Sequence, residues 1–252
     1  MKAVSYTHLD VYKRQPREYP IQNYDYVISC SDAWKSAFSQ AFGVKEEAVI
    51  SCGLPRVDVL HKEEKVQQLK ERMIKQYPIL KEAFVYLYAP TFRGNIIKGF
   101  HYEQLPFEKM LQQLPKNSVI MYKMHPLLGD IDMGHHPRIL NMNQENLNAL
   151  LCVSDCLISD YSSVIFDYSI VGKQMIFYVP DLQEYKDTIG LNVVYEQMPG
   201  DICTTQTALL SSMQKQRTKR DPRLDSFTNA YFTYHDGNNA KRIAQLIVKA
   251  TA

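Results

Sequence analysis

The chain has 252 residues, of which 45% are hydrophobic and 22% charged, so it is long enough to bury the core of one large or two modest domains. A formal net charge of +2 argues against an extended basic surface, and we expect no nucleic-acid partner. The five cysteines form neither a CxxC pair nor a Cys/His zinc spacing, which predicts reduced thiols, no metal and no cofactor. Because no apolar run approaches the roughly 20 residues of a transmembrane helix, membrane contact is peripheral or lies in sequence not present here.

Residues 1–15 lack the apolar segment of a signal peptide. They can be encoded by an inverted repeat that resembles two head-to-head sequencing adapters. We interpret them as an assembly artefact, with a genuine polar tail as the alternative, and we expect the natural chain to extend upstream.

The first half of the chain alternates between strand and helix patterns. Residues 24–29 predict a short buried strand, followed by a helix that continues to about Phe42 and ends at Gly43. Residues 49–58 form a second apolar stretch with a Gly/Pro break, and a charged helix covers about 58–76. Strands are expected at 84–89 and 118–124, with a helix between them at about 102–114.

The second half contains the clearest strand–helix–strand unit. After a short strand at 138–142 and a helix at 144–153, residues 156–158 predict a strand, 159–163 a turn, 164–171 a helix and 175–179 the next strand. A last helix is expected at about 240–249. This alternation predicts an α/β fold with a doubly wound parallel sheet.

Polar side chains follow three of the predicted strands. In open parallel sheets, ligands bind beyond the carboxyl ends of the strands, so these clusters are the candidate site. They are Thr91-Phe92-Arg93, Lys123-Met124-His125 and Asp160-Tyr161-Ser162-Ser163.

Ser162 and Ser163 open a helix, where unpaired backbone N–H groups and the positive end of the helix dipole favour a phosphate. Simple capping by Asp160 and the serines is the alternative. Asp167 lies one helical turn beyond Ser163 and reaches either the hydroxyls of a ligand or a neighbouring cation.

Two basic side chains at the other strand ends could contact the same phosphate. His125 precedes a proline, which holds it extended, and an imidazole there can donate to a phosphate or act as an acid or base. Arg93 offers a planar fork suited to phosphate, with an ordinary loop arginine as the alternative.

In order and spacing, these segments resemble the CDP-glycerol:poly(glycerophosphate) glycerophosphotransferase family of teichoic-acid synthesis. The Asp-Tyr-Ser-Ser block is the specific part of the resemblance. The matching segments are 88–93, 123–126, 155–168, 177–181 with Tyr185, and 235–238.

The resemblance implies a two-domain GT-B fold whose Rossmann-like C-terminal domain binds the donor. Residues 16–55 would then be the tail of a truncated N-terminal Rossmann-like domain and the linker, and 56–252 the CDP-polyol-binding domain. The implied reaction transfers glycerol phosphate or ribitol phosphate from CDP-glycerol or CDP-ribitol to a lipid-linked polyol-phosphate acceptor, releasing CMP. The implied location is cytoplasmic, peripheral on the inner face of the cell membrane.

The resemblance assigns the catalytic role to His125. It assigns contact with the substrate to nine side chains: Thr91, Arg93, Lys123, His125, Asp160, Tyr161, Ser162, Ser163 and Asp167. In one respect the chain departs from the family, because it lacks the His-Gly-Thr-type motif of the first domain. A GT-B glycosyltransferase that uses a nucleotide sugar, and a donor-binding fragment without turnover, therefore remain alternatives.

Overall fold

The structure, a computed structural model, describes residues 24–95, 99–128, 131–191 and 193–251. The interpretation of residues 1–15 as an artefact lies outside these ranges. Within them, no helix combines the length and apolar character needed to cross a bilayer. The same residues contain no group of three or more His, Cys, Asp or Glu side chains arranged to hold a metal ion.

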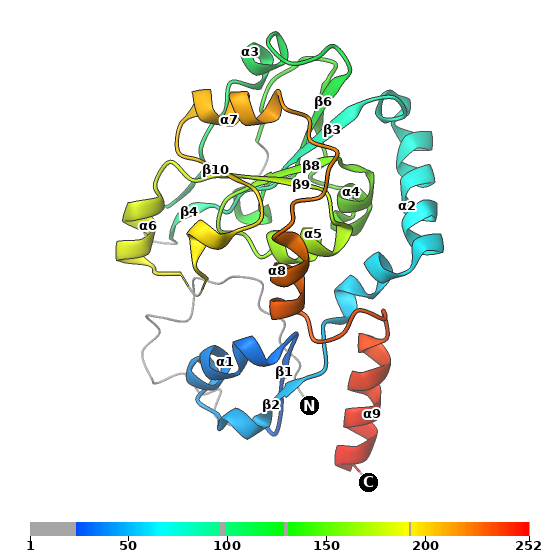
Figure 1. Cartoon of the computed structure of the whole chain (residues 1–252), viewed down its shortest axis with the longest axis vertical. Helices are drawn as coiled ribbons and strands as arrows, with labels where there is room; N and C mark the ends of the chain where they lie inside the picture. The colour runs from blue at the N-terminus through cyan, green and yellow to red at the C-terminus, as the bar shows by residue number, and fades with distance from the viewer. Residues whose placement is uncertain (1–23, 96–98, 129–130, 192, 252) are drawn as a thin grey trace.

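A six-stranded parallel sheet forms the centre of the molecule, in the order β10-β9-β8-β3-β6-β7 (Figure 1). This sheet confirms the predicted α/β class. Five of the strands, β3 and β6 to β9, lie within one or two residues of the ranges predicted from the sequence. Their signal is clear because the apolar runs of four of them, all but β7, are buried on both faces. The strands are β3 (Phe84–Tyr88), β6 (Ser118–Tyr122), β7 (Ile139–Asn141), β8 (Cys156–Ser159), β9 (Gln174–Tyr178) and β10 (Asp201–Cys203).

Helices cover both faces of the sheet and complete three layers. Along β3, Val85 and Leu87 enter one core cluster while Tyr86 and Tyr88 enter the other, as expected for side chains that alternate along a strand. The first cluster is covered by α2 (Glu63–Gln76), α4 (Leu147–Val153), α5 (Val164–Val171) and α8 (Leu224–Tyr231). The second is covered by α3 (Phe107–Leu111) and α7 (Gln206–Met213).

The first described residues form a separate small unit. Strands β1 (Val27–Ser29) and β2 (Val49–Ser51) pair in parallel, joined by α1 (Lys35–Phe42), which ends at Gly43 in the left-handed conformation as predicted. In Figure 1 this unit lies beyond one face of the main sheet, near α9 (Asn239–Thr251). Trp34, the buried residue directly before α1 in the sequence, packs edge-on against Phe166 of α5, with ring centroids 5.5 Å apart.

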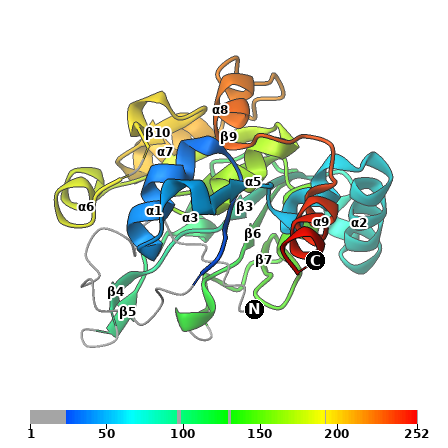
Figure 2. The same ribbon diagram turned by 90° about the horizontal axis from the view of Figure 1, so that it is seen from below.

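Several elements differ from the expected pattern. The helix expected at 102–114 is only the short α3, because Pro106 and Pro115 bracket it. The charged helix expected from residue 58 starts as the 3-10 helix η3 (Pro55–His61) and becomes α-helical only at Glu63. Strand β10 and helices α7 and α8 have no counterpart in the sequence prediction, nor have α6 (Leu182–Thr188) and the hairpin of β4 (Arg93–Asn95) and β5 (Gly99–His101). Seen from below, this hairpin lies at the margin of the molecule (Figure 2).

Short 3-10 helices complete the described chain. Besides η3 they are η1 (Asp32–Trp34), η2 (Glu46–Ala48), η4 (Pro78–Leu80), η5 (Pro126–Leu128) and η6 (Tyr195–Gln197).

Candidate functional site

The strand order places the switch point of the sheet between β3 and β8. From β3 the chain adds β6 and β7 on one side and then returns to place β8, β9 and β10 on the other. In open α/β sheets, the crevice outside the carboxyl ends of two such strands is where ligands bind. The three polar clusters predicted from the sequence follow β3, β6 and β8, and they therefore share this edge.

The turn between β8 and α5 is fixed by hydrogen bonds to the segment after β3. The Asp160 carboxylate accepts from the backbone N–H of Thr91 and from its hydroxyl, each over 2.8 Å. The Ser159 hydroxyl donates to the carbonyl oxygen of Ala89 over 2.7 Å, and the Tyr195 hydroxyl donates to the carbonyl of Asp160 over 2.6 Å. Because all these groups are buried, the turn is held rigidly at the switch point.

Ser162 and Ser163 stand at the start of α5 with their side chains half-buried. Ser163 is the N-cap residue, and its side chain makes no capping hydrogen bond. The Ser162 hydroxyl accepts from Val164 N–H over a long 3.4 Å. Two serine hydroxyls therefore stand at the N-terminus of α5, where the positive end of the helix dipole favours a phosphate.

Arg93 was expected to bind a phosphate, but in the structure its guanidinium is held by two carboxylates. Its Nε and Nη2 donate to Asp181 over 2.7 and 3.2 Å, and its Nη1 donates to Asp160 over 2.9 Å and to the Thr91 hydroxyl over 2.7 Å. Burial alone would lower the pKa of Arg93, but the hydrogen bonds and the charges of both carboxylates raise it. Arg93 therefore joins the loops after β3, β8 and β9.

Asp181 is a member of this cluster that was not among the candidate site residues. Burial alone would raise the pKa of Asp181, but the hydrogen bonds and the charge of Arg93 outweigh burial and lower this pKa. The hydroxyl of Tyr161 also donates to Asp181 over 3.0 Å, and the Tyr161 ring lies 5.0 Å from the guanidinium carbon of Arg93. Asp181 lies three residues after β9, so its place at a strand end was the signal that could have identified it.

His125 follows β6 on the other side of β3. Its Nδ1 accepts from the backbone N–H of Leu127 over 3.2 Å, so the neutral ring carries its proton on Nε2. The ring packs against Phe92, with centroids 4.7 Å apart. Neighbouring strands lie about 4.8 Å apart, and β3 lies between β6 and β8, so the carboxyl ends of β6 and β8 are separated by roughly 10 Å.

Lys123 was expected to contact the ligand, but its ammonium group binds the protein backbone. It donates to the carbonyl oxygens of Asn143 and Glu145 over 2.8 and 2.9 Å. Burial lowers the pKa of Lys123, and the charge of Glu145 opposes part of this shift. The structure thus gives Lys123 the role of tying β6 to the loop after β7.

Asp167 was expected to reach the ligand, and the structure again supplies a partner from the protein. Both carboxylate oxygens accept from Arg56, over 2.9 and 3.1 Å, and the Asp167 side chain is only 3% exposed. Burial raises the pKa of Asp167, and the charge of Arg56 opposes part of this shift. Of the two alternatives considered for Asp167, the structure shows the ion pair.

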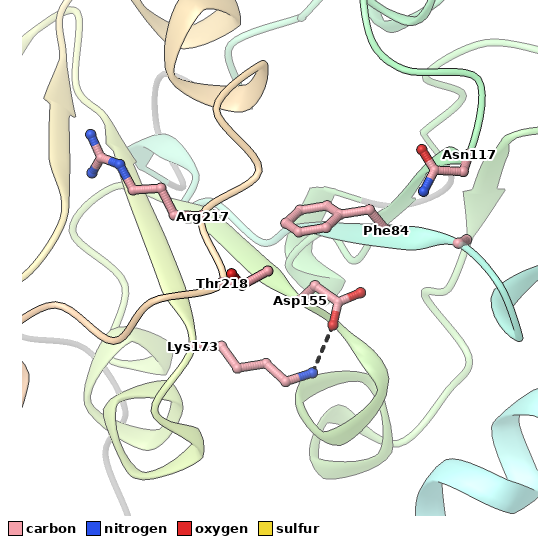
Figure 3. A pocket seen from close by; sticks show the side chains of 7 residues that line it. Phe84, Asn117, Asp155, Lys173, Arg217 and Thr218 are labelled. Atoms are coloured by element: carbon pink, nitrogen blue, oxygen red, sulfur yellow. Dashed lines mark hydrogen bonds and ion pairs between the residues drawn. The ribbon is translucent and has the colours of Figure 1, made fainter.

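A cavity of about 350 Å³ lies at the opposite, amino-terminal edge of the sheet (Figure 3). Its two cationic side chains are occupied, because Lys173 pairs with Asp155 over 2.9 Å and Arg217 pairs with Asp201 over 2.7 Å. Strand ends of this polarity are not where open α/β sheets bind ligands, so the crevice at the switch point remains the candidate site.

Comparison with known proteins identifies the family of the chain. The family model of CDP-Glycerol:Poly(glycerophosphate) glycerophosphotransferase matches residues 1–249. The chain is 35% identical to the teichoic acid ribitol-phosphate polymerase TarK of Staphylococcus aureus, over 82% of this chain and 42% of that protein. It is 30% identical to the teichoic acid glycerol-phosphate primase of Bacillus subtilis, over 89% of this chain and 58% of that protein. The chain thus spans about two fifths to three fifths of these relatives.

Solved structures give the same answer for the fold. A variant of the wall teichoic acid polymerase TagF soaked with CDPG matches with a TM-score of 0.80 and 26% identity, over 99% of this chain and 66% of that chain. The UDP-GlcNAc 2-epimerase of Neisseria meningitidis matches with a TM-score of 0.58 at 16% identity, over 89% of this chain and 62% of that chain, which extends the likeness in fold alone. The sequence match over nearly the whole chain shows that it belongs to the CDP-glycerol:poly(glycerophosphate) glycerophosphotransferase family.

Proposed function

We propose that this chain binds the CDP-polyol donor of a polyol-phosphate transferase and that its diphosphate lies at the N-terminus of α5. The observation that carries the proposal is the pair of serine hydroxyls at this helix start, on a turn fixed by the Asp160–Thr91 hydrogen bonds. Such a turn presents its donors without rearrangement, which is how a site stabilises charge on a phosphate.

The remaining residues of the crevice have separable roles in this proposal. Ser162, Ser163 and the first N–H groups of α5 bind the diphosphate, and Nε2–H of His125 donates to the phosphate that leaves with CMP. Asp160 and Arg93 hold the cradle in place, because each is engaged by protein partners. Catalytic assistance falls to His125, the one imidazole in the three polar clusters predicted from the sequence.

The proposed reaction is an in-line transfer of a phosphoryl group. A hydroxyl of the lipid-linked acceptor attacks the phosphorus of the polyol phosphate, the bond to the CMP oxygen breaks, and CMP leaves. The proton of the attacking hydroxyl passes to a base, and the donors of the cradle stabilise the charge that develops on the leaving phosphate. This is mainly a task of positioning and electrostatics.

The division of labour follows from the proposed domains. Residues 56–252 form the donor domain, residues 16–55 belong to the first domain and the linker, and the base for the acceptor hydroxyl comes from the His-Gly-Thr-type motif of the first domain. The acceptor is a lipid-linked polyol phosphate, and the protein works at the inner face of the cell membrane. Both CDP-glycerol and CDP-ribitol are donors to be tested, since the relatives include enzymes named for each polyol.

Isothermal calorimetry with CDP-glycerol and CDP-ribitol tests donor binding by the chain. We expect a variant with Ser162→Ala and Ser163→Ala to remain folded and to bind the donor about tenfold more weakly, the equivalent of about 1.4 kcal/mol. Thr205→Ala is the matched control, because Thr205 caps α7 through its hydroxyl and lies outside the crevice. Equal donor affinity in the double variant and the unmodified chain would return the serines to simple capping.

Release of CMP tests the reaction in a chain that includes a first domain of this family. We expect CMP from CDP-glycerol or CDP-ribitol in the presence of a polyol-phosphate acceptor. Turnover of a UDP-sugar without any CMP release would support the alternative of a nucleotide-sugar glycosyltransferase and refute the proposal.

A further inference from the structure

The ion pair between Arg56 and Asp167 joins two parts of the chain that are 111 residues apart. Arg56 lies in η3, directly after the segment that leads out of β2, whereas Asp167 lies in α5. The pair is a bidentate fork, with Nε and Nη2 of Arg56 on the two oxygens of Asp167. Such a fork fixes direction as well as distance.

The Arg56 end of the pair is itself anchored. Its backbone carbonyl accepts from the Asn148 side chain of α4 over 2.8 Å, and the next residue, Val57, is fully buried in the core. The Arg56 side chain is 31% exposed, so neighbouring side chains do not enclose it fully and the ion pair with Asp167 fixes its position. The backbone of η3 therefore offers a fixed point against which α5 can be held.

The Asp167 end lies directly behind the serine cradle. Asp167 follows Ser163 by four residues, and in a helix such residues lie one above the other on the same face. In the same turn, Phe166 packs against Trp34 with the rings nearly perpendicular, at 83°. The start of α5 thus carries the two serine hydroxyls, and its first turn carries two attachments to the segment of residues 34–56.

We propose that Arg56 and Asp167 are a positioning pair that sets the direction of the α5 N-terminus and thereby the affinity of the phosphate cradle. The inference rests on the proposed function, because it concerns donor binding at Ser162 and Ser163. Stability alone does not account for the pair, since apolar side chains of similar volume often stabilise a core as well as a buried ion pair does. Orientation of a helix end is what a bidentate fork adds.

The test measures donor affinity in a double-mutant cycle of Arg56→Gln, Asp167→Asn and the combination of both. Because the two side chains act as one unit, each single variant should raise the dissociation constant by roughly 2- to 30-fold, and the combination should raise it no further. Arg56→Lys keeps the charge without the fork and should recover only part of the affinity. Calorimetry at a temperature well below each thermal midpoint ensures that only folded protein is compared.

Arg223→Gln serves as a matched control, because Arg223 forms an exposed fork with Asp221 outside the crevice. The emission of Trp34, the sole tryptophan, reports whether the contact with α5 persists in each variant. If Asp167→Asn alone does not fold, Arg56→Lys and the combined variant, which leaves no unpaired buried charge, still decide the question.

The outcomes separate the inference from the function on which it rests. Unchanged dissociation constants in folded Arg56 variants would overturn the inference while leaving donor binding intact. A loss confined to Asp167→Asn would likewise overturn it and assign Asp167 to direct contact with the donor. Absence of donor binding in the unmodified chain would refute the proposed function together with the inference.

Discussion

Replacement of Arg93 by methionine tests whether this arginine holds the site together. The guanidinium makes charge-assisted hydrogen bonds to Asp160, whose side chain is 5% exposed, and to Asp181, whose side chain is 28% exposed. Methionine occupies a similar volume but offers no donor, so Arg93→Met leaves the Asp160 carboxylate with only its two hydrogen bonds from Thr91.

The expected cost follows from the burial of the two carboxylates. Breaking a buried ion pair by removing one partner costs about 3–5 kcal/mol, and the hydrogen bonds that remain on Asp160 place the cost at the lower end. Loss of the more exposed contact with Asp181 adds about 0.5–1 kcal/mol. A decrease of about 4 kcal/mol in the free energy of unfolding corresponds to roughly 2 M in the urea midpoint, at a slope of about 2 kcal/mol/M.

Urea unfolding followed by circular dichroism measures this free energy directly. Arg220→Met is the matched control, because Arg220 makes a similar fork with Asp225 in which the two side chains are 46% and 72% exposed. The control should lose less than about 1 kcal/mol. A loss below about 1 kcal/mol in Arg93→Met would refute the conclusion that Arg93 holds the loops and would restore it as a candidate phosphate ligand.

Three further predictions address single positions. Lys123→Met should lower the free energy of unfolding by about 1–2 kcal/mol without changing donor affinity, because Lys123 donates to two backbone carbonyls. Urea unfolding checks the first effect and calorimetry the second. Gly53→Ala should cost more than about 1–2 kcal/mol in the same unfolding assay, because Gly53 has a φ of +79° and a Cβ there would lie 2.0 Å from the buried Asn239 side chain. Because Arg93 holds the pKa of Asp181 below its ordinary value, the stabilisation by Asp181 is complete above that value, about pH 4, and is lost as the pH falls through the lowered pKa. Asp181→Asn should therefore flatten the acid limb of a plot of thermal midpoint against pH.

Local signals predicted the part of the site that is local in the sequence. Helix α5 begins and ends at the predicted residues, Val164 and Val171, because a strand end, two serines and a terminal Gly172 define it within a few positions. The fold class followed from the alternation of strands and helices. These features depend on residues within about ten positions of one another.

The partners of the charged side chains could not be predicted in the same way. Arg93 and Lys123 lie at strand ends as expected. The carboxylate acceptors of Arg93 are 67 and 88 residues away, and the carbonyl acceptors of Lys123 are 20 and 22 residues away. Strand-end position predicts which edge of the sheet a side chain occupies. It does not distinguish a side chain that binds a ligand from one that binds a neighbouring loop.

The missed elements have physical reasons of their own. Helix α8 spaces its apolar residues three to four positions apart, but over only eight residues, and strand β10 has three residues. Both are too short for a clear periodicity. Their place is set by tertiary contacts, such as the pairing of β10 with β9 and the packing of Phe227 against Phe166. Such short elements become stable only within the complete core.

The pairing of charges around the crevice limits how a donor can be held. Arg93 is shared between Asp160 and Asp181, and Arg56 is paired with Asp167, so carboxylates of the protein already offset the charge of each guanidinium. The groups assigned to the phosphates in the proposed cradle are backbone N–H groups, two serine hydroxyls and the imidazole of His125. Binding must then depend on dipoles of fixed direction, which gain strength only when they point at the phosphate. The fixed direction of α5 is for this reason the property on which the proposed site depends most.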